Sequence, residues 1–64
     1  MFEEQDQVRF TTDIPGTPVR RGDVGTIVYI HEEPPLRYDV ELADPDGRTI
    51  ARVTVTASQI EPLD

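Results

Sequence analysis

The fold of this chain is decided by one stretch, Arg20-Arg21-Gly22-Asp23-Val24-Gly25-Thr26-Ile27-Val28-Tyr29-Ile30. It joins a tight turn to the most strand-like run of the sequence, because β-branched and aromatic side chains suit a pleated, half-buried surface. Gly22 is expected to take a positive φ in the turn. Gly25 is expected to mark a β-bulge or the close approach of another backbone. Since a bulge resets the alternation, Ile27 is assigned to the core, whereas the facing of the next two residues stays open.

On both sides of this stretch, four further segments have the pattern of short strands: residues 7–11, 38–42, 49–56 and 60–63. Residues 38–42 alternate most cleanly, which places Tyr38, Val40 and Leu42 inside and Asp39 and Glu41 outside.

The connections between these strands have their own signals. Residues 44–47, Asp-Pro-Asp-Gly, predict a β-turn, and residues 57–59 fit one turn of 3₁₀ helix. Residues 12–18 contain two prolines and a glycine, so we expect a loop that folds back with Ile14 tucked inward. Pro62 is acceptable only at an edge or at a strand end.

Five short strands without a useful helical segment favour a closed architecture, because a flat sheet of this size exposes two edges and buries only one face. The sequence therefore predicts an all-β, single-domain, five-stranded SH3-like barrel with one 3₁₀ turn before the last strand. Residues 1–6 are expected to form a flexible N-terminus and residues 7–64 the barrel domain. The expected core is Val8, Phe10, Val24, Ile27, Tyr38, Val40, Leu42, Ala51, Val53, Val55 and Ile60, with Ile14 and Val19 as lids.

The composition narrows the possible partners and compartments. The 64 residues include 13 acidic and 6 basic side chains, for a net charge of −7, and no cysteine. The acidic balance repels phosphate backbones and is compatible with a basic protein partner. The absence of cysteine fits a reducing compartment, and the acidic start of the sequence with no long apolar run predicts neither a signal peptide nor a membrane span. We therefore expect an acidic cytoplasmic protein.

Several quoted segments together resemble a known family: Val8-Arg9-Phe10, Asp13-Ile14-Pro15, residues 21–28, residues 38–42 and residues 46–51. They look like a family of short bacterial proteins catalogued as a domain of unknown function, number 4926. The resemblance covers residues 7–63 and implies a small SH3-like barrel, in some members encoded near toxin or immunity-like genes. It implies no activity and no catalytic residues. Residues 22–26, Gly-Asp-Val-Gly-Thr, are also similar to the KOW-type turn of ribosomal and transcription-elongation proteins.

No residue pattern indicates catalysis or a metal. His31 and the two glutamates after it alternate in direction on an extended strand, so they do not converge on one ion. Asp44 and Asp46 lack the spaced oxygen ligands of a calcium loop. Ser58 has only His31, in a different segment, as a base. We therefore expect no catalytic, cofactor or metal site and no enzymatic activity.

A protein-binding groove is the more serious candidate. In SH3-like barrels a groove lies between the long first loop, the loop after the second strand and the 3₁₀ turn. The residues predicted to line it are Ile14, Tyr29, His31, Leu36 and Tyr38. With few aromatic residues and no tryptophan, a proline-rich ligand is disfavoured. The alternative is that Tyr38 belongs to the core and Tyr29 is a half-buried strand residue.

Three classes of function remain. The first is a non-enzymatic protein-interaction module, an accessory or antitoxin-like and immunity-like partner of a neighbouring gene product, or a domain that self-associates through a strand edge. The second is a KOW-like nucleic-acid or ribosome-associated module, which the acidic charge disfavours. The third is a small SH3-like subunit of a larger enzyme complex.

Overall fold

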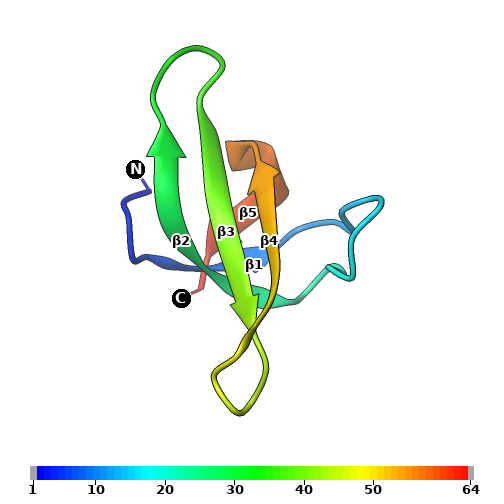
Figure 1. The fold of residues 1–64 in the computed structure, drawn as a ribbon. Helices are drawn as coiled ribbons and strands as arrows, with labels where there is room; N and C mark the ends of the chain where they lie inside the picture. Colours follow the sequence, from blue (N-terminus) through cyan, green and yellow to red (C-terminus); the bar gives the residue numbers. More distant parts are fainter. Residues whose placement is uncertain (1, 64) are drawn as a thin grey trace.

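The structure is a computed structural model that describes residues 2–63, and its strands form one antiparallel sheet (Figure 1). The elements in chain order are β1 (Gln7–Phe10), β2 (Val24–His31), β3 (Arg37–Ala43), β4 (Thr49–Val55), the 3₁₀ turn η1 (Ala57–Gln59) and β5 (Ile60–Pro62). The strand order is β4-β3-β2-β1-β5, so the sheet is open at β4 and β5. The prediction of five strands and one 3₁₀ turn is confirmed, whereas residues 1 and 64 of the predicted segments lie outside the described residues.

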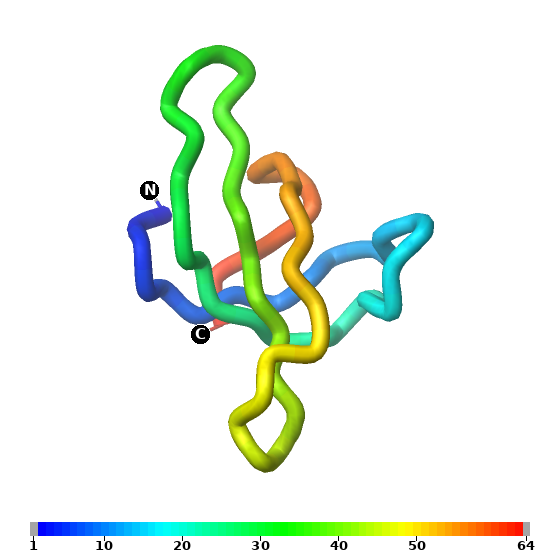
Figure 2. Tube along the Cα trace, in the orientation of Figure 1, coloured from blue at the N-terminus to red at the C-terminus, as the bar shows by residue number. Residues whose placement is uncertain are grey.

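The sheet has two halves, one formed with β3 and β4 and the other with β1 and β5, and β2 belongs to both. Its first residues pair with β1, with Thr26 opposite Gln7, and the strand continues along β3 until His31 lies opposite Arg37. β2, β3 and β4 lie side by side, while β1 and β5 cross behind them (Figure 1). The hairpin between β2 and β3 extends well beyond the other strands, as the tube in Figure 2 shows.

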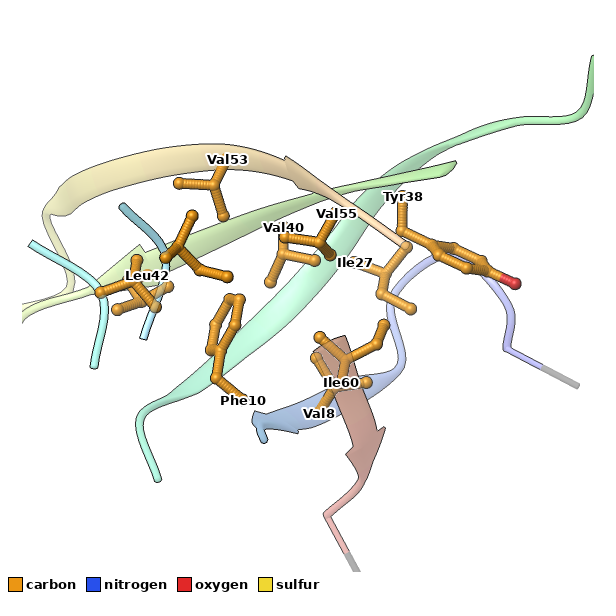
Figure 3. Packing of buried hydrophobic residues seen from close by; sticks show 11 residues of the cluster. Val8, Phe10, Ile27, Tyr38, Val40, Leu42, Val53, Val55 and Ile60 are labelled. Carbon is orange, nitrogen blue, oxygen red and sulfur yellow. The ribbon is translucent and has the colours of Figure 1, made fainter. Parts of the chain in front are cut away.

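The core lies between these two halves of the sheet (Figure 3). Its buried side chains are Val8, Phe10, Ile14, Val19, Ile27, Tyr38, Val40, Leu42, Val53, Val55 and Ile60. All of them belong to the predicted core and its lids, and the two predicted core residues that are not buried are Val24 and the half-buried Ala51. Tyr38 lies at one end of the cluster with its hydroxyl pointing away from it.

The assignment of Val24 to the core is wrong, because its side chain is 41% exposed. The pairing of β1 with β2 runs without a shift through Gly25, which lies opposite Val8. Gly25 and Ile27 therefore face inward and Val24 faces outward. The register shift occurs later, between Ile27 and Tyr29.

Gly25 instead marks a close approach, the other alternative that the sequence offered. A Cβ atom at this position would lie 2.6 Å from Cγ1 of Val40 and 2.9 Å from the backbone oxygen of Glu41. Both contacts are shorter than ordinary packing distances, and a backbone oxygen in a paired strand cannot move aside easily. Only glycine lets β2 lie this close to β3.

The predicted turns are confirmed. Gly22 has a φ of 94°, and the N–H of Asp23 donates to the carbonyl of Arg20 at 3.0 Å. At the turn between β3 and β4, Oδ1 of Asp44 accepts from the N–H groups of Asp46 and Arg48 at 3.0 and 2.9 Å.

Residues 2–6, part of the predicted flexible N-terminus, lie along β2 (Figure 1). The N–H of Gln5 donates to the carbonyl of Ile27, and the N–H of Ile27 donates to the carbonyl of Asp6, at 2.7 and 2.9 Å. The ring of Phe2 packs edge-on against Tyr38 with the ring centres 5.4 Å apart. This segment therefore brings a large apolar side chain to the loop end of the β2–β3 hairpin.

We predict that Gly25→Ala destabilises the fold by about 1–3 kcal/mol, because the added methyl group overpacks the contact with β3. Gly25→Val should leave the chain unfolded. Urea denaturation followed by circular dichroism measures both. Gly22→Ala is the control: nothing lies within 4 Å of its Cβ position, and only the positive φ opposes the substitution. If Gly25→Ala is as stable as the wild type, the close approach does not constrain the fold.

Candidate functional site

Two adjoining hollows lie where the β2–β3 hairpin meets the N-terminal segment. The first is lined by Phe2, Glu3, Glu4, Ile30, Glu32, Leu36 and Tyr38. The second is lined by Glu4, Tyr29, Ile30, His31, Glu32, Glu33 and Arg37. Because Glu4, Ile30 and Glu32 line both, the hollows form one continuous region, which we call the hairpin-end surface.

The first hollow offers apolar contact area. Leu36 follows two prolines in the hairpin loop and is 43% exposed, one of the few large apolar side chains left in solvent. Phe2 and Ile30 are half-buried beside it, and Tyr38 beneath them belongs to the core. An exposed apolar side chain beside half-buried ones is typical of the centre of a contact surface.

The rim of the hairpin-end surface is acidic. Glu3 and Glu4 reach it from the N-terminal segment, and Glu32 and Glu33 from the hairpin loop. Arg37 is the cation among the lining residues. Four glutamates among the residues that line the hairpin-end surface favour cationic groups over anionic ones.

Four of the five predicted site residues meet at this surface. Leu36 and Tyr38 line the first hollow, and Tyr29 and His31 line the second. Tyr29 is 50% exposed. Tyr38 is buried, as in the alternative that assigns it to the core. Ile14 is buried in the loop of residues 12–18, which lies on a different side of the molecule from the hairpin end (Figure 1), so the structure does not bring it to the other four.

Asp39 is a residue of this region that sequence reasoning missed. It faces outward on β3, as the alternation predicts, yet it is only 8% exposed. Its Oδ1 accepts hydrogen bonds from the Thr54 hydroxyl at 2.7 Å and from Nε2 of His31 at 2.9 Å. Its Oδ2 accepts from Nη2 of Arg52 at 3.2 Å. One carboxylate therefore joins side chains of β2, β3 and β4 across the outer face of the sheet.

The protonation of Asp39 follows from these contacts. Burial raises the pKa of its carboxyl, but the hydrogen bonds from Thr54, His31 and Arg52 outweigh it and hold the pKa below the ordinary value of 3.8. The carboxylate stays charged at neutral pH. Because a carboxylate only accepts hydrogen bonds, Nε2 of His31 carries a hydrogen.

This network orders part of the hairpin-end surface. His31 is held by Asp39, and the ring of Tyr29 packs edge-on against His31 with ring centres 4.8 Å apart. The exposed aromatic rim of the second hollow is thus fixed to the sheet.

The same network does not have the geometry of an activated nucleophile. Thr54 and His31 both bond to Oδ1 of Asp39 and not to each other, so no imidazole accepts the hydroxyl proton. Among residues 2–63, no three His, Cys, Asp or Glu side chains cluster as a metal site requires.

Comparison with known proteins gave one match. A family model described as "Domain of unknown function (DUF4926)" matches residues 4–62. Searches of curated proteins and of solved structures found no match. None of the helical structure within residues 2–63 has the length and apolar character needed to span a membrane.

We predict that Asp39→Asn destabilises the protein at neutral pH by about 1–3 kcal/mol, because it removes a charged hydrogen-bond acceptor. Since the pKa of Asp39 is lower in the folded than in the unfolded state, its contribution is complete above the unfolded pKa and is lost as the pH falls. The stability difference between wild type and variant should therefore shrink between about pH 5 and pH 2.

Urea unfolding across this pH range measures that difference. Asp46→Asn is a control with the same charge change at an exposed turn position. A difference that is constant with pH would contradict the role assigned to the Asp39 carboxylate.

Proposed function

This chain belongs to the DUF4926 family, and we propose that it is a non-enzymatic protein-interaction module that binds a basic segment of a partner at its hairpin-end surface. The observation that carries the proposal is the combination of an apolar floor at Leu36 and Phe2 with a rim of four glutamates. The partner segment has an apolar anchor residue flanked by arginine or lysine.

Both halves of this recognition have a physical basis. An apolar side chain of the partner would cover Leu36 and the edge of Phe2, which removes apolar surface from water. Cationic neighbours would lie near Glu3, Glu4, Glu32 and Glu33, where complementary charge speeds association and selects the partner. Because the rim is exposed, its contribution weakens as salt is added.

The architecture of the module supports the same proposal. We propose that the open sheet is a variant of the SH3-like barrel, because the order β4-β3-β2-β1-β5 and the 3₁₀ turn before β5 fit that fold. A location in the bacterial cytoplasm completes the proposal and rests on the cysteine-free composition and the family resemblance.

The nucleic-acid alternative has less support at the turn that suggested it. The N–H of Arg20 donates to Oδ2 of Asp23 at 2.9 Å, and the N–H of Arg21 donates to Oδ1 of Asp13 at 2.8 Å. Two carboxylates are therefore held against the backbone of this turn, and a carboxylate repels phosphate.

A displayed peptide library built from Arg, Lys, Leu, Phe and Ser tests the proposal. Wild-type protein should enrich peptides that combine an apolar residue with flanking cations, and added salt should weaken their binding. Leu36→Lys removes the apolar anchor point and adds a like charge, so we expect binding at least about tenfold weaker by calorimetry.

Ile50→Lys is the matched control. It makes the same charge change at another exposed apolar position, on β4 and away from the hairpin-end surface, and should bind as the wild type does. The proposal is overturned if no cationic peptide is enriched, or if both variants bind equally well.

A further inference from the structure

The two edges of the sheet differ in how well they are protected. β5 ends the sheet on one side with three residues, one of them Pro62, and such a short edge offers little to a further strand. β4 ends it on the other side with seven residues, Thr49–Val55, and no proline; the register with β3 shifts at Ile50 and is continuous over residues 51–55. β3 is the only strand of residues 2–63 that pairs with β4.

The direction of the backbone groups along β4 follows from the hydrogen bonds of β2, which lies two strands away in the sheet. In an antiparallel ladder, N–H and C=O of one residue point to one neighbouring strand and those of the next residue to the other. The N–H and C=O of Ile27 bond to the N-terminal segment, so those of Thr26 point to β3, where Thr26 lies opposite Glu41.

The alternation then continues across β3. Because Glu41 points to β2, Val40 points to β4, where it lies opposite Val53. Val53 therefore directs its backbone groups toward β3, and its neighbours Arg52 and Thr54 direct theirs away from it. No backbone bond from Arg52 or Thr54 to another segment occurs within residues 2–63.

The one charge on β4 does not guard this edge. Arg52 is the only ionisable residue of Thr49–Val55, and charged side chains commonly keep edge strands from pairing. Its guanidinium is turned back over the sheet by two carboxylates of β3, with Nη2 3.2 Å from Oδ2 of Asp39 and Nη1 3.6 Å from Oε2 of Glu41. The edge also carries Ile50, which at 55% is the most exposed of the large apolar side chains within residues 2–63.

We infer that the β4 edge pairs with β4 of a second copy of this chain, antiparallel about a twofold axis at Val53. This register places Arg52 opposite Thr54 of the other copy and extends the ladder over residues 51–55. An axis at Arg52 would oppose two guanidinium groups. The basic segment proposed for the hairpin-end surface does not fit this edge, because the only formal charge of β4, on Arg52, is also positive.

The net charge of −7 makes this association weak at low salt, because two acidic copies repel each other. Added salt screens that repulsion and should strengthen the dimer. This salt dependence is opposite to the one expected for the basic segment, so the two interactions can be told apart and can fail separately.

Amide hydrogen exchange by NMR, together with sedimentation equilibrium in high salt, tests the inference on the full chain. From micromolar to millimolar protein, the mass should rise toward twice that of one chain. The amides of Arg52 and Thr54 should become protected at least about tenfold over the same range. The amides of Val53 and Val55, bonded to β3, should be protected at both concentrations.

Two variants with the same charge change complete the test. Ile50→Lys places a cation on the edge and should shift dimer formation to at least about tenfold higher concentration. Leu36→Lys, at the hairpin end, should dimerise as the wild type does. A single-chain mass at millimolar protein overturns the inference. So does a dimer in which the Arg52 and Thr54 amides exchange as fast as in the monomer, or one that Ile50→Lys leaves unchanged.

Discussion

The arrangement of β2, β3 and β4 depends on the carboxylate of Asp39, a nearly buried charge on the outer face of the sheet. A charge removed from water is tolerated only when other groups replace its hydration. His31 from β2 and Arg52 and Thr54 from β4 do so, each through a direct hydrogen bond. Because these partners come from both neighbours of β3, the network favours one register of the three strands over any slipped pairing.

The same carboxylate connects the two surfaces proposed for binding. Through His31 it fixes Tyr29 at the acidic hairpin end, and through Arg52 it turns the only charge of β4 away from the sheet edge. The hairpin-end surface has four glutamates and one arginine among its lining residues, and the guanidinium of Arg52 is drawn away from the β4 edge. A basic segment and a second copy of the chain would thus occupy separate sites with opposite responses to salt.

The sequence predicted those features that depend on local chemistry. Turns at Gly22 and at residues 44–47, the 3₁₀ turn and most of the core follow from residue type and alternation. Val24 was misplaced because a bulge can follow any of several residues, and only pairing with β1 and β3 locates it after Ile27. The burial of Asp39 was out of reach because its partners lie 8, 13 and 15 residues away, and their convergence depends on register. Ile14 was grouped with the hairpin residues by analogy with a groove, although its loop packs on another side.

Asp39 is thus a charged anchor held by side chains of both neighbouring strands. Carbon-13 NMR of the side-chain carboxyl groups, followed during a pH titration of the folded protein, measures it directly. We predict that the carboxyl of Asp39 titrates with a pKa below the ordinary value of 3.8, because the hydrogen bonds from Thr54, His31 and Arg52 outweigh burial. A pKa at or above that ordinary value would mean that burial dominates and that these three partners do not hold Asp39 as a charged anchor.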